Sequence, residues 1–260
     1  MSFRAYRIIL LLSILFAITG ITYWENWSVT QWKTPLEVVI YPVNGEDVSD
    51  ADVYAGTQAF MDTLTGSDFQ EISSFIDRQS ERYLLKKLPV TVVRLGPQVK
   101  AQPPAAQSQG RSVFDTILWS LKLRYYAFQH TPFMDSLGKV RLFVVYHKGE
   151  NNMPLQHSLG LKKGLFGVVH VFARTEQKKQ NNVVITHELL HALGATDKYD
   201  SHLQPIYPEG FGDAESGPRY PQHVAEIMAG RIAISPTRAI IPDSLDACVI
   251  GYKSAHEINW

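Results

Sequence analysis

The sequence has a single cysteine and no formal net charge, and each of these features excludes some kinds of site or function. Only Cys248 is present among 260 residues, so neither an internal disulfide nor a cysteine-based zinc cluster can form. The 25 basic and 25 acidic residues balance to a formal net charge of zero, and no basic block stands out. The electrostatic basis for nucleic-acid binding is therefore missing. The apolar content is that of an ordinary globular protein and suffices for one substantial domain.

The N-terminus carries the longest apolar run. Arg4 and Arg7 precede residues 8–21, and Tyr23 and Trp24 follow them. A positive start, an apolar stretch and terminal aromatic residues are typical of a segment that inserts into a membrane. The alternative is a signal peptide that is cleaved near Ala17-Ile18-Thr19, which would release a secreted protein.

This pattern divides the chain into three parts. We expect residues 1–24 to form an uncleaved membrane anchor, residues 25–35 a juxtamembrane linker, and residues 36–260 one domain outside the cytoplasm, in the periplasm or the extracellular space. Trp27 and Trp32 in the linker either lie at the lipid interface or pack against the domain. The oligomeric state does not follow from the sequence.

Strand and helix patterns alternate along this domain. Short runs rich in β-branched residues predict strands, and apolar residues three or four apart predict helices. The expected strands are 36–41, 89–95, 139–147 and 164–173; the expected helices are 50–85 with a break near 65–67, 113–128, 180–193 and 245–260; and 198–225, with four prolines, is expected to be a long loop.

The order of these elements predicts an α/β (α+β) fold. Early strand–helix alternation favours a mixed, mostly parallel sheet. The strand at 164–173 follows its predecessor closely, so we expect it to be an antiparallel edge strand beside helix 180–193. A substrate polypeptide could then add to the sheet along this exposed edge.

Residues 187–197 read HELLHALGATD and carry the strongest chemical signal in the chain. His187 and His191 are four residues apart, so one helix face presents both imidazoles to a single metal ion. Glu188 is placed to act as general base on a metal-activated water. Gly194 can adopt a left-handed conformation and end the helix, which returns Asp197 toward the metal as a third ligand. Three protein ligands and one water are typical of a catalytic zinc site.

Two alternatives to this site stay open. The motif helix could be a coincidence in which the histidines simply pack. Glu209 or Glu215, in the loop that follows, could replace Asp197 as the third ligand. Tyr199 either hydrogen-bonds the oxyanion or packs, and Cys248 is expected to be a small buried residue rather than a nucleophile. Five other histidines lack ligand spacing and are expected to be surface or core residues: His130, His147, His157, His170 and His256. His202 and His223 lie in the loop after the motif.

The motif, followed by Glu226-Ile227-Met228-Ala229-Gly230, resembles the metzincin group of zinc peptidases. The Asp that replaces the usual third histidine resembles the snapalysin-type subgroup, as does Tyr199 after it. The resemblance implies a metzincin-like fold with an active-site helix, a Met-turn and a C-terminal helix. It implies His187, His191 and Asp197 as zinc ligands, Glu188 as catalytic base, and Met228 beneath the metal. The long loop between Asp197 and Met228 departs from the pattern.

A chain of this kind is expected to be a zinc metalloendopeptidase that hydrolyses peptide bonds of peptide or protein substrates. Asp197 should lower the Lewis acidity of zinc somewhat relative to a third histidine. Two other functions fit the same residues: a non-catalytic zinc-binding envelope protein, against which the intact Glu188 argues, and an amidase that acts on cell-wall peptides.

Overall fold

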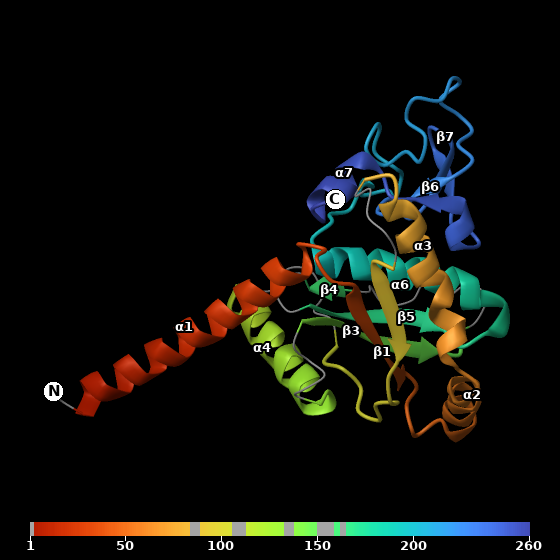
Figure 1. The fold of residues 1–260 in the computed structure, drawn as a ribbon. Coiled ribbons are helices and arrows are strands. Elements are labelled where there is room, and N and C mark those ends of the chain that lie inside the picture. Colours follow the sequence, from red (N-terminus) through yellow and green to blue (C-terminus); the bar gives the residue numbers. More distant parts are fainter. Residues whose placement is uncertain (1–2, 84–88, 106–112, 133–137, 150–158, 162–164) are drawn as a thin grey trace.

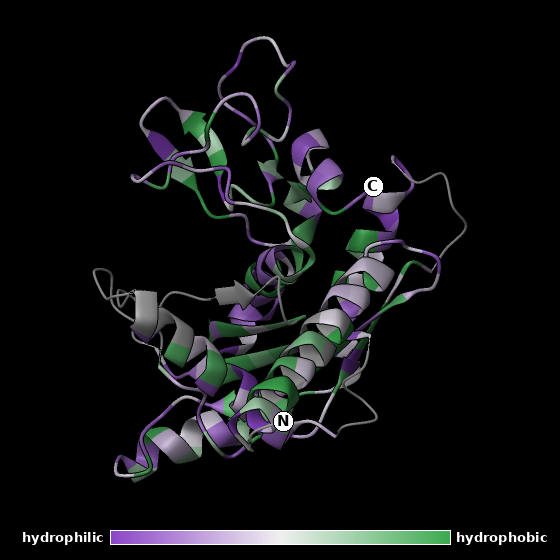
Figure 2. Cartoon of the chain, turned by 90° about the vertical axis from the view of Figure 1, so that its left-hand side faces the viewer, coloured by the Kyte–Doolittle hydropathy of each residue, from purple (hydrophilic) through white to green (hydrophobic). Residues whose placement is uncertain are grey.

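A five-stranded sheet lies at the centre of the chain (Figure 1). The computed structural model describes residues 3–83, 89–105, 113–132, 138–149, 159–161 and 165–260. The strands are β1 (Leu36–Asn44), β2 (Thr91–Leu95), β3 (Lys139–His147), β4 (Leu159–Leu161) and β5 (Phe166–Phe172), in the spatial order β2-β1-β3-β5-β4. In Figure 2 the strands of this sheet are mostly coloured hydrophobic, as expected for a sheet covered on both faces.

The pairing confirms a mostly parallel sheet but corrects the position of its antiparallel edge. β2, β1, β3 and β5 run parallel to one another, and only β4 runs antiparallel, to β5. The prediction that the strand at 164–173 is an antiparallel edge strand is therefore wrong, because β5 pairs with β3 on one side and with β4 on the other. The edge that could accept a further strand on this side belongs to Leu159–Leu161.

Helices cover both faces of the sheet. On one face lie α2 (Ala51–Asp62), α3 (Gln70–Ser80) and α6 (Lys178–Leu193), whose apolar side chains share one core with β1, β3 and β5. On the other face α4 (Val113–His130) packs Leu123 and Tyr126 against Phe143 of β3 and Phe166 of β5. A short 3-10 helix, η1 (Gly66–Phe69), lies between α2 and α3 and confirms the expected break.

The N-terminal helix α1 (Phe3–Val29) projects away from the rest of the chain (Figure 1). It continues through residues 25–29, which the sequence places in a linker. Of the helices that the structure describes, none has the length together with the apolar composition needed to cross a membrane. Trp32 packs rather than facing outward, because it is buried against Trp260 and its Nε1 donates to the Ile258 carbonyl at 2.8 Å.

The C-terminal part, after a short 3-10 turn η3 (Thr175–Gln177) and helix α6, is built of loops and short elements. β6 (Ala225–Glu226) pairs with β9 (Cys248–Val249), and β7 (Ile232–Ser235) pairs with β8 (Arg238–Ile240). One helix over 245–260 is a wrong prediction: this segment forms a 3-10 turn η4 (Leu245–Ala247), β9 and a short helix α7 (Tyr252–Glu257). Gly251 precedes α7 in an extended conformation and begins it.

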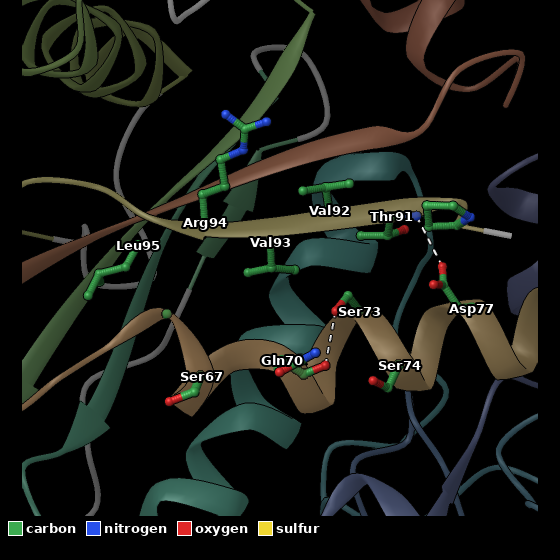
Figure 3. Close-up of a pocket in the computed structure, with 12 residues that line it drawn as sticks. Ser67, Gln70, Ser73, Ser74, Asp77, Thr91, Val92, Val93, Arg94 and Leu95 are labelled. Atoms are coloured by element: carbon green, nitrogen blue, oxygen red, sulfur yellow. Dashed lines mark hydrogen bonds between the residues drawn. The ribbon is translucent and has the colours of Figure 1, made fainter.

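A groove of about 820 Å³ lies between α3 and the outer edge of β2, opposite the β4 edge of the sheet (Figure 3). Ser73 and Ser74 of α3 line it on one side, and Thr91 and Val93 of β2 on the other. At one end of the groove the Asp77 carboxylate accepts hydrogen bonds from the backbone N–H groups of Val90 and Thr91, at 2.9 and 3.1 Å. Asp77 therefore satisfies backbone donors at the start of this edge strand.

Candidate metal site

The motif helix α6 ends where the sequence predicts. Gly194 has φ of 118°, in the left-handed region, and its N–H donates to the carbonyls of Leu190 and His191. The N–H of Ala195 also donates to the Leu190 carbonyl, at 2.9 Å. These bonds satisfy carbonyls that the last helical turn would otherwise leave open, and they turn the chain back on itself.

The turn brings Asp197 against both histidines of the helix. The Asp197 Oδ1 lies 3.3 Å from His187 Nε2 and 3.0 Å from His191 Nε2. One ligand atom from each of the three residues lies within 4.8 Å of the other two. Two ligands on one tetrahedral zinc ion at about 2.0 Å are separated by about 3.3 Å, so the spacing fits a shared ion.

Backbone carbonyls set which nitrogen of each imidazole is available. The Nδ1 of His187 lies 2.9 Å from the Ile227 carbonyl, and the Nδ1 of His191 lies 2.8 Å from the Ala195 carbonyl. A carbonyl can only accept, so each Nδ1 carries the hydrogen and each neutral ring has its lone pair on Nε2. The lone pairs on both Nε2 atoms therefore face Asp197, and a free lone pair on this nitrogen is what a metal-ligating histidine needs.

The charges in this cluster are tightly coupled. Burial alone lowers the pKa of His187, but in the protonated ring Nε2 can donate to Asp197, and this bond together with the charge of Glu188 outweighs burial and raises that pKa. Burial alone raises the pKa of Asp197, but hydrogen bonds to His187 and His191 hold it well below its ordinary value. Asp197 is thus an anion near neutral pH, which is the form in which a carboxylate can ligate a metal ion.

Glu188 lies beside the cluster and is buried, with 5% of its surface exposed. Its charge helps to raise the pKa values of both His187 and Tyr199, so it lies within electrostatic reach of the cluster. A buried carboxylate next to three potential ligands is where a proton acceptor for a metal-activated water must lie.

Met228 lies in a tight turn that contacts the motif helix. Gly230 has φ of 66°, and its N–H and that of Ala229 donate to the Glu226 carbonyl. Met228 is fully buried, and its carbonyl accepts from the Lys198 N–H at 3.0 Å. The turn thus contacts the segment that carries Asp197, while the neighbouring Ile227 carbonyl holds His187.

Glu226 is a structural residue that the sequence reasoning missed. It is fully buried, and its Oε2 accepts from the N–H groups of Met228 and Ala229 at 2.7 and 3.0 Å. Its Oε1 accepts from the Gly251 N–H at 3.1 Å, which connects the turn to the start of α7. Its position two residues before Met228 in the E-I-M-A-G segment was the available signal, but the partners come from the tertiary fold.

Tyr199 both packs and hydrogen-bonds. Its ring stacks near that of His187, with centroids 6.5 Å apart and an interplanar angle of 25°. Burial raises its pKa to about 12, with further contributions from the charge of Asp197 and a hydrogen bond to it. The hydroxyl is therefore protonated at neutral pH and serves as a donor at the edge of the cluster.

The other candidate ligands lie elsewhere. Glu209 and Glu215 are exposed in the loop after the motif, and the three-ligand group contains neither of them. Asp200 accepts hydrogen bonds from the backbone of His202 and Gln204, so it shapes a turn. Burial raises the pKa of Cys248 to about 12, so its thiol is not ionised at neutral pH.

The remaining histidines are spread over the chain. The rings of His147 and His170 stack at the far ends of β3 and β5, with Nε2 of His147 2.9 Å from Nδ1 of His170. His130 contacts Tyr126 in α4, His256 is exposed in α7, and His157 lies outside the described residues. Among described residues, the one group of three with ligand spacing is His187, His191 and Asp197.

No protein-family model matches this sequence, and a comparison with curated proteins finds no significant match.

The donor set fits a zinc ion. Two neutral imidazole nitrogens and one carboxylate oxygen suit a divalent metal of borderline softness, and both imidazoles are oriented by second hydrogen bonds. His187, His191 and Asp197 would hold the ion, with Glu188 beside it. These three ligands would leave one position of a tetrahedral ion open.

Proposed function

We propose that this chain is a zinc-dependent peptidase of metzincin-like type. The observation that carries the proposal is the convergence of His187 Nε2, His191 Nε2 and an Asp197 carboxylate oxygen, with buried Glu188 beside them. The mostly parallel sheet, the motif helix and the buried Met228 turn that contacts this helix also support it. A purely structural site would not need a buried carboxylate that takes no part in the ligand group.

Different residues of the chain would carry out different parts of the reaction. Bound zinc would supply Lewis acidity that activates water and polarises a carbonyl. Glu188 accepts the proton from the attacking water and returns it to the leaving amine. Tyr199, whose protonated hydroxyl hydrogen-bonds Asp197, helps to orient that ligand. The carbonyls of Ile227 and Ala195 keep both imidazoles in the ligating tautomer.

The proposal is tested with the full chain and with Glu188→Gln. The wild type is expected to cleave members of a broad peptide library after zinc loading, and cleavage should stop when the zinc is removed. Glu188→Gln keeps the ligands and the volume, so it should keep zinc but lose about 10²–10⁴-fold in cleavage rate. Equal cleavage by the two proteins would remove Glu188 from the reaction, and zinc binding without cleavage by either would favour a binding protein.

We further propose that the chain is attached to a membrane through its N-terminal segment, which places the peptidase outside the cytoplasm. Support comes from the basic start at Arg4 and Arg7 and from the projection of α1 away from the sheet (Figure 1). Large apolar side chains are exposed along α1, among them Ile8, Leu10, Phe16 and Trp24. Fractionation of expressing cells before and after removal of residues 1–29 tests this: the full chain should sediment with membranes and the shortened chain should not.

A further inference from the structure

The segment that carries Asp197 is exposed, yet its two neighbours are fixed by α7. Thr196 and Asp197 are both exposed, whereas the Lys198 side chain between the loop and α7 is only 4% exposed. A ligand on an exposed segment is mobile unless adjacent residues hold the backbone, because fixing the backbone costs conformational entropy. The contacts of Thr196 and Lys198 therefore decide how well Asp197 is oriented.

Glu257, near the end of α7, binds both neighbours of the ligand. Its Oε2 accepts from the Thr196 N–H at 2.8 Å, and its Oε1 accepts from the Thr196 hydroxyl at 3.0 Å. The same Oε2 lies 2.9 Å from Lys198 Nζ in an ion pair. Burial raises the pKa of Glu257, but its bonds to Lys198 and Thr196 outweigh this and lower it, so the carboxylate is charged at neutral pH.

Lys198 connects Thr196 with Glu257 through its side-chain ammonium group. Its ammonium donates to the Thr196 carbonyl at 2.7 Å and to the Thr196 hydroxyl at 2.7 Å, as well as to Glu257. All three of its hydrogens are thus used within the loop and α7. Its backbone N–H donates to the Met228 carbonyl, and its backbone carbonyl accepts from the Ile206 N–H. The residue after Asp197 is therefore held by the Met228 turn, by the following loop and by α7.

α7 itself is fixed from two sides. At its start the Gly251 N–H donates to buried Glu226. Just after its end Ile258 is fully buried, and its carbonyl accepts from Trp32 Nε1. Glu257 is thus held at the end of a helix that is fixed at both ends, and its ion pair with Lys198 connects the loop to this helix.

We propose that Lys198 and Glu257 are positioning residues for the metal ligand Asp197, so that α7 sets the metal affinity of the site. This inference rests on the proposed function, because it assumes that Asp197 is a ligand. The network touches no ligand atom, and it acts by holding the backbone on both sides of Asp197. Loss of partners outside the ligand shell typically weakens metal binding by about 10–100-fold.

The test measures zinc affinity by chelator competition and the visible absorption of the cobalt-loaded protein, using the full chain. Lys198→Met keeps the volume of the side chain and removes the ion pair. Glu257→Gln keeps one oxygen acceptor, and Thr196→Val, at an exposed position, removes the hydroxyl that donates to Glu257 and accepts from Lys198. The matched control is Lys178→Met, which breaks the Lys178–Asp68 ion pair of 2.8 Å at the other end of α6.

Lys198→Met is expected to weaken zinc binding about 10–100-fold and to change the cobalt spectrum, since the ligand geometry changes. Thr196→Val and Glu257→Gln should weaken it less, and Lys178→Met should leave affinity and spectrum unchanged even where it lowers thermal stability. If Lys198→Met does not fold, the zinc affinities and cobalt spectra of Thr196→Val and Glu257→Gln test the positioning role instead. Wild-type zinc affinity and spectrum in every folded variant overturn the positioning role alone, whereas a wild type that binds no zinc overturns the proposed function as well.

Discussion

His187 Nδ1 lies 2.9 Å from the carbonyl oxygen of Ile227, forty residues further along the chain. This contact joins the motif helix to the turn that holds Met228, and it fixes the tautomer of His187 with the lone pair on Nε2. One hydrogen bond thus connects the first half of the candidate site to the second.

Asp197 is the ligand whose removal separates the competing choices for the third position. Asp197→Ala should bind zinc at least about 100-fold more weakly, because an open site with two imidazoles lacks its only anionic donor. Asp200→Asn is the matched control, since Asp200 is also an exposed aspartate of this segment and an amide keeps the oxygen that accepts from the backbone. Zinc affinity measured by chelator competition decides; wild-type affinity of Asp197→Ala would return Glu209 and Glu215 to consideration.

Gly194 is expected to be intolerant of a side chain because of its backbone conformation. Its φ of 118° is left-handed, so Gly194→Ala should lower the free energy of unfolding by about 1–2 kcal/mol. Gly56→Ala is the matched control, since Gly56 is exposed inside α2 and a Cβ there meets nothing within 4 Å. That change should raise stability by about 0.4–1 kcal/mol. Chemical denaturation of both variants tests the pair, and equal effects would contradict it.

Glu226 should be needed for the Met228 turn because both of its carboxyl oxygens accept hydrogen bonds from backbone N–H groups. Glu226→Gln leaves one oxygen where the carboxylate has two, and it directs an amide N–H₂ toward backbone donors. A buried donor left without a partner costs about 1–3 kcal/mol, so thermal unfolding should begin at a lower temperature. Glu209→Gln, at an exposed position, should change little. A Glu226→Gln protein as stable as the wild type would show that the turn does not depend on this carboxylate.

His170 should make the fold sensitive to acid. Burial, with a smaller contribution from His147, lowers the pKa of His170 from 6.5 to about 4. The unfolded chain therefore binds the proton more readily in this interval, and the folded state loses stability as the pH falls from about 6.5 to about 4. The loss due to this residue is at most about 3 kcal/mol.

Denaturation at a series of pH values tests this, since His170→Asn should flatten the dependence between pH 6.5 and 4. His256→Asn, at an exposed position in α7, should keep the wild-type slope. An unchanged slope in His170→Asn would assign the sensitivity to other groups.

Local spacing explains why the first part of the candidate site could be predicted from the sequence. His187 and His191 share a helix face by geometry, and Gly194 ends the helix through a conformation that glycine favours. The parallel strands also follow from local composition, because β1, β3 and β5 are continuous apolar runs.

Tertiary contacts explain what could not be predicted. β4 has only three residues, which are too few to show an alternating pattern in the sequence. The sequence therefore predicts that the antiparallel edge strand of the sheet is β5. The segment 245–260 has helical composition, but Cys248 and Val249 pair with β6 and Gly251 separates them from α7. Glu226 and Glu257 act through partners distant in the sequence, which no local spacing indicates.

The most direct measurement is the zinc content of the full chain after zinc loading and removal of excess metal, determined by elemental analysis. We expect one zinc per wild-type chain and a loss of that zinc in His187→Ala and His191→Ala. The control variant His256→Ala should keep it. A wild-type chain without zinc, or zinc that stays when both His187 and His191 are replaced, would contradict the site.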